Sequence, residues 1–248
     1  MAHRKGKRLS EEQQTEAIQF MEKDRTVDVT KKYKVDIKCK TPNQKKFVNL
    51  IKEKEIIICG GQAGTGKTFL SCAEALKLLQ SEVRFKKIVI VKSVTVLEGE
   101  DVGYLKGDLK AKMEYFIYSF ISNFIKLIGK PNTEAMVTAG LIETMPLAYL
   151  RGMSIDNSII IIDECQNISK KNMRTIMTRL GENSKMIFIG DEKQIDLQKK
   201  SESSLAIIMK KFADQDGFGI MHFSKEDIVR NPLIKIIEDV FDEIESEK

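Results

Sequence analysis

The chain has 248 residues, of which 42% are hydrophobic and 31% are charged, which suits one large domain or a domain with an appendage. Its formal net charge of +5 is too small to indicate a nucleic-acid partner by itself. Two histidines, and four cysteines without CxxC spacing, argue against a zinc site, and a disulfide framework does not suit a chain of this length.

Residues 1–40 are predicted to form a basic arm, MAHRKGKR, followed by a small helical appendage. Ser10 with Gln13 is a capping-box signal for a helix over residues 11–23, and residues 26–36 would add a second short helix. Such a pair resembles a helix-turn-helix, so the appendage either contacts nucleic acid or is purely structural. The N-terminus lacks the apolar run of a signal peptide, and we therefore expect a cytoplasmic protein.

Residues 41–248 are predicted to form one core domain, in which short apolar runs alternate with helix-length segments. Strands are predicted at residues 56–59, 87–91, 158–163, 185–191 and 219–223, and helices at residues 67–80, 169–180 and 231–245. This alternation favours an α/β fold with a mainly parallel sheet covered by helices on both faces.

Residues 98–150 are predicted to form an insertion in this core, with loops, one amphipathic helix and a hairpin around residues 140–152. The helix lies within residues 113–129, where polar residues interrupt an apolar segment, so it either packs on the core or forms a subunit interface. No stretch reaches the roughly 18 apolar residues that a membrane helix needs, and no membrane partner is expected.

The segment GGQAGTGKT, residues 60–68, contains the phosphate-loop pattern GxxxxGK[ST] between a predicted strand and a predicted helix. Backbone N–H groups from Gly64 to Thr68 would surround the β-phosphate, and Lys67 would bridge the β- and γ-phosphates. The Thr68 hydroxyl would bind Mg²⁺. The predicted nucleotide-binding residues of this segment are Gly61, Gln62, Ala63, Gly64, Thr65, Gly66, Lys67, Thr68 and Phe69.

The segment IIIIDE supplies a candidate acid pair. Asp163 ends a buried strand, so its carboxylate emerges at the sheet edge where the phosphate loop lies and would hold Mg²⁺, through a water molecule. Glu164 would orient or deprotonate the attacking water, which favours hydrolysis over simple binding of the phosphate. The alternative for Glu164 is an acid at the start of a helix, stabilised there by the helix dipole.

A third element is FIGDEKQID, where a predicted strand ends in Gly190-Asp191 and Gln194 follows three residues later. An amide on this loop could contact the γ-phosphate or the water and report hydrolysis to the rest of the protein.

Several motifs together resemble the PhoH-like family of ATPases, over residues 41–237. They are GQAGTGKT, AYLRG, IIIIDECQN, TRLG, GDEKQIDL and DIVRNPL. The resemblance implies a RecA-like P-loop core, a three-layer sandwich that binds ATP with Mg²⁺. The motif order is also similar to the first motor domain of superfamily 1 helicases. It implies RNA or single-stranded DNA as the partner and helicase-like remodelling as the output.

In that helicase group a glutamine ahead of the loop contacts adenine, and Gln44 stands at the matching place. An arginine downstream of GDxxQ contacts the γ-phosphate, and Arg230 is the matching candidate, in competition with Arg151, Arg174 and Arg179. The alternative for each arginine is a surface or interface ion pair. The family resemblance further implies a homo-oligomer, a hexameric ring, in which the arginine would act in trans.

The chain departs from the family pattern at three places. The family's Arg-Pro pair after the second strand is Lys92-Ser93 here, its LPGD is LKGD with Lys106, and the usual alanine after the acid pair is Cys165. The first two departures affect a candidate polynucleotide contact on the loops of residues 93–110. The lysines proposed for that contact, with a solvated lysine face as the alternative, are Lys92, Lys106, Lys110 and Lys112.

Rival functions are a small-molecule kinase and a nucleotide-gated adaptor that hydrolyses slowly and docks through the basic arm and the acidic C-terminal tail. A kinase would need neither GDxxQ nor the adjacent acid pair. A GTPase is the weakest rival, because the chain contains no Asn-Lys-x-Asp motif for reading guanine.

Overall fold

A computed structural model describes residues 33–92, 120–150, 152–197, 199–231 and 233–246. The predicted helix over residues 11–23, most of the second short helix, the lysine-bearing loops of residues 93–110 and Arg151 lie outside these ranges. Those expectations therefore remain predictions.

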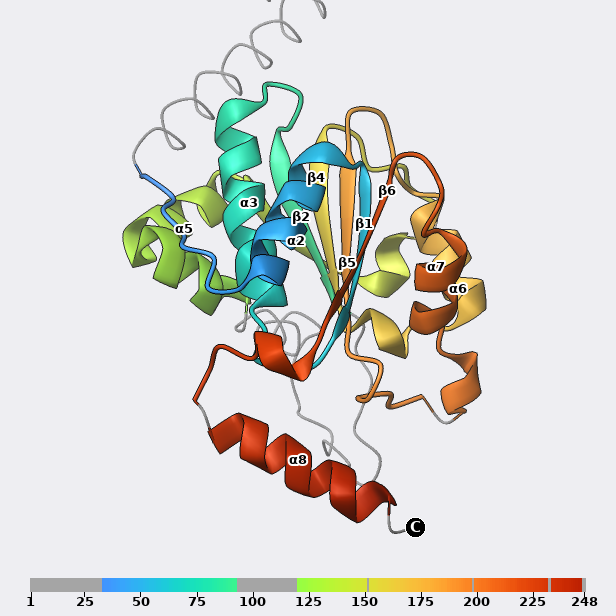
Figure 1. The fold of residues 1–248 in the computed structure, drawn as a ribbon. Coiled ribbons are helices and arrows are strands. Elements are labelled where there is room, and N and C mark those ends of the chain that lie inside the picture. The colour runs from blue at the N-terminus through green and yellow to red at the C-terminus, as the bar shows by residue number, and fades with distance from the viewer. Residues whose placement is uncertain (1–32, 93–119, 151, 198, 232, 247–248) are drawn as a thin grey trace, which may run out of the picture.

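The core of the protein is a six-stranded sheet in which every paired strand runs parallel to its neighbour (Figure 1). The strands are β1 (Ile56–Gly61), β2 (Lys87–Lys92), β3 (Ile142–Pro146), β4 (Ser158–Asp163), β5 (Lys185–Ile189) and β6 (Phe218–Phe223). Their order across the sheet is β3-β2-β4-β5-β1-β6. Because all six are parallel, their carboxyl ends meet at one edge, where ligands bind in open α/β sheets.

Helices cover both faces of the sheet, which makes a three-layer sandwich (Figure 1). One layer contains α2 (Pro42–Glu53), α3 (Lys67–Ser81), a helix at residues 120–128 and α5 (Lys130–Thr138). The other layer contains α6 (Lys170–Met177) and α7 (Leu205–Lys211). The short 3₁₀ helices are η1 (Leu147–Leu150), η2 (Cys165–Asn167), η3 (Lys200–Glu202) and η4 (Lys225–Asp227).

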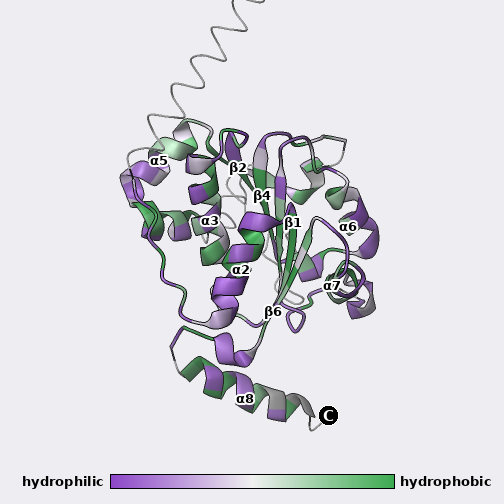
Figure 2. Cartoon of the chain, turned by 45° about the horizontal axis from the view of Figure 1, so that its top comes forward, coloured by the Kyte–Doolittle hydropathy of each residue, from purple (hydrophilic) through white to green (hydrophobic). Residues whose placement is uncertain are grey.

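The isoleucine runs of the strands explain this layering. In β4, Ile159 and Ile161 pack in the cluster under α2 and α3, while Ile160 and Ile162 pack in the cluster under α6 and α7. A strand buried on both faces needs a continuous apolar run rather than an alternating one, and IIII supplies it. Figure 2 shows the hydrophobic colouring concentrated along these central strands.

The predicted hairpin around residues 140–152 is wrong. Residues 142–146 form β3, which pairs in parallel with β2 from Ile88↔Ile142 to Lys92↔Pro146, and η1 follows directly. A parallel partner cannot come from an adjacent hairpin strand, because the chain must first cross over. Pro146, which has no N–H to donate to a neighbouring strand, is tolerated because β3 is an edge strand.

The described part of the predicted amphipathic helix packs on the core. Phe120, Phe124 and Ile128 are all buried in the cluster beneath α3. This burial supports the core-packing alternative over the interface for residues 120–128. Within the described ranges, no helix is long and apolar enough to cross a membrane.

The last helix, α8 (Leu233–Ser246), lies beside the sandwich instead of within it (Figures 1 and 2). The ion pair Lys225 Nζ–Asp239 Oδ1, at 2.6 Å, links it to η4. Its exposed apolar residues lie at helical spacing, and they are Leu233, Ile236, Ile237, Val240, Phe241 and Ile244.

The four cysteines are free thiols. Cys59, Cys72 and Cys165 are buried, and burial raises the pKa of each thiol well above its ordinary value. They pack as small apolar side chains.

Candidate nucleotide-binding site

The phosphate loop connects β1 to α3 at the carboxyl edge of the sheet. Gly66 caps the N-terminus of α3 with φ 90°, and Gly61 has φ 122°, both in the region that side chains disfavour. At Gly61 a Cβ would also collide with the carbonyl oxygen of Phe223 on β6. The glycines therefore fix a backbone that places successive N–H groups at a helix N-terminus, which is an arrangement suited to an anion.

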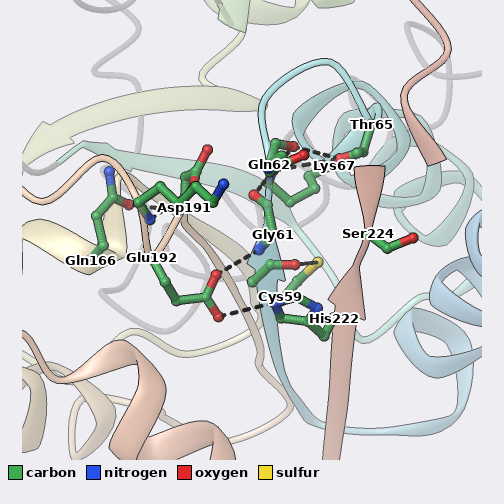
Figure 3. A network of polar contacts seen from close by, with 12 residues as sticks. Cys59, Gly61, Gln62, Thr65, Lys67, Gln166, Asp191, Glu192, His222 and Ser224 are labelled. Atoms are coloured by element: carbon green, nitrogen blue, oxygen red, sulfur yellow. Dashed lines mark hydrogen bonds and ion pairs between the residues drawn. The ribbon is translucent and has the colours of Figure 1, made fainter. Parts of the chain in front are cut away.

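Lys67 is folded back into this loop and is only 8% exposed (Figure 3). Its Nζ donates hydrogen bonds to the carbonyl oxygens of Gly61 and Gln62, the latter at 2.7 Å. These two carbonyls use two of the three N–H donors of the ammonium group, so a phosphate in the loop would compete with them for it.

Two carboxylates after β5 hold the first half of the loop, a role that was not predicted for either residue. Glu192 accepts from the Gly61 N–H at 2.9 Å, and Asp191 accepts from the Ala63 N–H at 3.1 Å. Figure 3 shows Glu192 between Gly61 and His222, whose Nε2 is 3.6 Å from Glu192 Oε1. The N–H groups from Gly64 to Thr68, which are the predicted phosphate ligands, are not part of this carboxylate clamp.

Asp163 and Glu164 leave β4 at the same edge. Asp163 is in register with Lys92 of β2, and both acids line a cavity that also contains Lys67 and Thr68. Glu164 has φ 55°, a left-handed conformation that is uncommon for a residue other than glycine and that costs free energy. Surrounding structure must hold Glu164 in this conformation.

Gln166 supplies part of that structure, and sequence reasoning missed it. Its side chain is fully buried, and Nε2 donates to Glu164 Oε2 at 2.8 Å and to the Gln194 carbonyl at 2.9 Å. Its Oε1 accepts from the Asp191 N–H at 3.0 Å. One amide therefore joins the acid pair to the loop that follows β5.

A second link runs parallel to the first. Asn167 Nδ2 donates to Asp196 Oδ2 at 2.9 Å, and the Asp196 N–H donates to Asn167 Oδ1 at 2.8 Å. Gln166 and Asn167 thus join the turn after β4 to the loop after β5 at two places, and we expect these two segments to move together.

Gln44 supports the phosphate loop from α2. It is 3% exposed, donates from Nε2 to the Thr65 carbonyl at 2.9 Å and accepts from the Lys40 N–H at 2.7 Å. Gln44 also lines the cavity, but both ends of its amide have partners within the chain. Its predicted contact with adenine remains a prediction.

The cavity measures about 540 Å³ and brings together most of the predicted site. The predicted residues that line it are Gln44, Ala63, Gly64, Gly66, Lys67, Thr68, Phe69, Asp163, Glu164, Gln194 and Arg230. Gly61, Gln62 and Thr65 form the loop behind this lining. Lining residues that were not predicted include Lys38, Lys40, Asn123 and Lys126.

Among the described arginines that competed for the γ-phosphate, Arg230 lines the cavity, whereas Arg174 and Arg179 do not. Arg179 instead donates to the Thr175 carbonyl at 3.2 Å and to the Thr178 hydroxyl at 3.2 Å. Within one chain, the geometry therefore favours Arg230.

The parallel sheet, the glycine loop and the acid pair define a P-loop nucleotide-binding protein with a RecA-like core, in which β5 separates the loop strand β1 from the acid-bearing strand β4. The model of the family described as PhoH-like protein matches residues 36–242, and the chain belongs to this family.

Relatives of known name agree with this assignment. The chain is 36% identical to a PhoH-like protein of Bacillus subtilis (strain 168), over 95% of this chain and 76% of that protein. It is 32% identical to a PhoH-like protein of Synechocystis sp., over 85% of this chain and 63% of that protein. Among solved structures, a Sulfolobus solfataricus SWI2/SNF2 ATPase core in complex with dsDNA is 16% identical. That alignment covers 80% of this chain and 47% of the other, with a TM-score of 0.47.

Proposed function

We propose that this chain binds ATP with Mg²⁺ and hydrolyses it to ADP and phosphate. The observation that carries the proposal is the convergence of Lys67, Glu164 and Arg230 on one cavity at the carboxyl edge of the sheet. A cation for the phosphates, a base for water and an arginine for developing charge are the parts that phosphoryl transfer requires.

The residues present fit a magnesium ion. Thr68 and Asp163 line the cavity together and offer a hydroxyl and a carboxylate, which are oxygen ligands that Mg²⁺ prefers. In the part of the chain that the structure describes, no cluster of three or more acids, histidines or cysteines could hold a metal unaided. In phosphoryl-transfer sites, phosphate oxygens and water complete the coordination shell of Mg²⁺. Bound there, the ion would neutralise charge on the β- and γ-phosphate oxygens.

The chain's own residues would share the remaining work. Lys67 would leave the carbonyls of Gly61 and Gln62 and bind the β- and γ-phosphates. Glu164, held by Gln166, would accept a proton from the water that attacks the γ-phosphorus as the bond to the β–γ bridging oxygen breaks. Gln194 would contact the γ-phosphate or the water, and Arg230 would stabilise charge on the transferring group.

We also propose that turnover is coupled to RNA or single-stranded DNA and that the chain works as a ring of identical subunits, of which a hexamer is the expected form. The order of the loop, the acid pair and the GDxxQ motif supports this proposal, as does the family. One RecA-like core offers only one face of a motor, so a second copy would supply the other.

The test is ATP turnover by the purified chain with no phosphate acceptor added, with and without single-stranded RNA or DNA, alongside a mass measurement in solution. Lys67→Ala should abolish release of ADP, while Lys171→Ala, at an exposed position of α6, should match the wild type. Phosphate that appears only on an added small acceptor would establish the kinase alternative instead. Slow turnover that no polynucleotide stimulates would favour the adaptor.

A further inference from the structure

Asp227 is a buried carboxylate that the mechanism above leaves unused. Asp227 ends η4, directly after β6, and is 3% exposed. Its oxygens accept hydrogen bonds from Thr41 Oγ1 at 2.8 Å, from Asn43 Nδ2 at 2.8 Å and from the Ser224 N–H at 3.0 Å. Two of these donors belong to the start of α2, more than 180 residues earlier in the chain. Asp227 therefore binds two distant segments together.

On one side of Asp227 lies the segment that carries the candidate arginine. The Val229 N–H donates to the carbonyl of Gly64 in the phosphate loop at 3.1 Å. A Cβ added at Gly64 would lie 3.4 Å from Ile228 Cγ2 and 3.5 Å from Arg230 Cδ. The stem of Arg230 thus runs beside the phosphate loop of its own chain.

On the other side of Asp227 lies the start of α2. Thr41 caps this helix by accepting from the Gln44 N–H at 3.2 Å, and Gln44 donates to the Thr65 carbonyl. Two routes therefore lead from Asp227 to the phosphate loop, one through Val229 to Gly64 and one through Thr41 and Gln44 to Thr65.

We propose that Asp227 is a positioning residue: it binds the start of α2 to the segment that carries Arg230 and so holds both in place beside the phosphate loop. In this position Arg230 points to the nucleotide bound by its own chain and not to that of a neighbouring subunit. The inference rests on the proposed ATP hydrolysis, within which it assigns a role to Asp227 and a side, in cis, to the arginine.

The first experiment is a double-mutant cycle between Asp227→Asn and Arg230→Ala, read as kcat and KM for ATP. Displacement of a catalytic group by about 1 Å can cost roughly 100-fold in rate, so Asp227→Asn should lower kcat by about that factor with little change in KM. In the double variant the two losses should not multiply, because Asp227 acts through Arg230. Multiplying losses, or an unchanged kcat for Asp227→Asn, would overturn the proposal.

Matched variants distinguish a role of Asp227 in positioning Arg230 from a role in folding. Glu226→Gln changes the exposed neighbouring carboxylate and should leave kcat as in the wild type. Asn43→Ala removes a single donor and keeps both Asp227 and the Thr41 cap of α2, so it should lower kcat less than Asp227→Asn, and again without multiplying the loss of Arg230→Ala. This second cycle decides the matter if Asp227→Asn fails to give a cooperative thermal unfolding transition. A wild-type chain that neither binds nor hydrolyses ATP would instead refute the proposed function itself.

The second experiment tests whether Arg230 acts on the nucleotide of its own chain, in cis, or on that of a neighbouring subunit, in trans. Lys67→Ala and Arg230→Ala chains are co-expressed with different tags, and complexes that carry both tags are purified. If Arg230 acts in cis, every site in these complexes lacks one essential group and turnover does not return. If Arg230 acts in trans, the Lys67→Ala chain lends its arginine to its neighbour, and recovered turnover would overturn the assignment. A chain that yields only monomers, and still hydrolyses ATP, supports action in cis.

Discussion

The side-chain amide of Gln166 donates to the carboxylate of Glu164 across 2.8 Å. Gln166 also accepts from the Asp191 N–H, so the orientation of its amide is fixed from both ends. Glu164, two residues before Gln166, holds a left-handed backbone conformation at the start of η2. The proposed base is thus oriented by an amide that also binds the backbone of the GDxxQ loop, so a shift of that backbone is expected to disturb it.

Replacing Gln166 by Glu tests this relationship. A second carboxylate cannot donate to Glu164 and repels it, so kcat should fall by about 10- to 100-fold, the usual cost of losing a buried supporting contact. ATP affinity should stay nearly constant, because Gln166 is not part of the phosphate loop. Steady-state kinetics would measure both quantities, with Gln215→Glu on an exposed turn as the control. Wild-type kcat in the Gln166 variant would show that Glu164 needs no support from this amide.

Glu164→Gln should bind ATP and stall. The amide keeps the size of the side chain but cannot accept a proton from water, and general-base catalysis contributes about 10²- to 10⁴-fold. Single-turnover assays would report the loss of hydrolysis, and calorimetry would report retained binding. Normal turnover would mean that another group accepts the proton.

Asp163→Ala should erase the dependence of turnover on magnesium. The variant loses the carboxylate proposed to hold the ion, so the residual rate should no longer respond to Mg²⁺ in the millimolar range. A magnesium titration at saturating ATP would measure this response, with the exposed Asp214→Ala as the matched variant. An unaltered titration curve would place the ion elsewhere.

Asp227 should make the free energy of unfolding depend on pH. Burial disfavours its charged form, but hydrogen bonds from Asn43, Thr41 and Ser224 outweigh burial and lower the pKa below its ordinary value. Because the pKa of Asp227 is lower in the folded state than in the unfolded state, its ionisation increases the free energy of unfolding at pH values above the unfolded pKa, about 4. This contribution is lost as the pH falls through the folded pKa. Chemical denaturation should therefore show that Asp227→Asn is less stable than the wild type at pH 7. The difference in free energy of unfolding between the two proteins should become smaller below about pH 4. A difference that is constant with pH would contradict a lowered pKa for Asp227.

Phe124→Ala should destabilise the fold by about 3–5 kcal/mol, the usual cost of removing a fully buried phenylalanine. Phe124 has no exposed surface and packs in the cluster beneath α3. The control is Val137→Ala, because Val137 is 44% exposed on α5, where the change should stay within about 0.5 kcal/mol. Denaturant unfolding would measure both, and a small effect at Phe124 would point to an interface for this helix.

Sequence patterns predicted those strands and loops that can be recognised from the residues of a single segment. The short apolar runs of β1, β2, β4 and β5 are typical of strands buried on both faces, and the glycine spacing before Lys67 predicts the phosphate loop. At β3 the sequence predicted a hairpin instead of a parallel edge strand, because a segment with Thr144 and Pro146 has neither a long apolar run nor a clear alternation to indicate its partner. The short helix α7 was missed because seven residues give too little periodicity to recognise.

The supporting residues of the candidate site were missed for a different reason. Gln166 acts on a loop 28 residues away, Glu192 on a loop 131 residues away and Asp227 on a helix 186 residues away. Each is an ordinary polar residue in its own segment, and its role depends on which distant segment the fold places beside it. Two acids directly after β5 were the one local sign that this loop carries more than Gln194.

The retracted position of Lys67 bears on how affinities for this protein should be interpreted. The Lys67 ammonium group donates to the carbonyls of Gly61 and Gln62, so a bound phosphate would compete with these hydrogen bonds, and the free energy of losing them would weaken the affinity for ATP. A substitution that weakens these hydrogen bonds of Lys67 would therefore increase the affinity for ATP although the substituted residue makes no contact with ATP. A gain in affinity alone would be no evidence of a new contact.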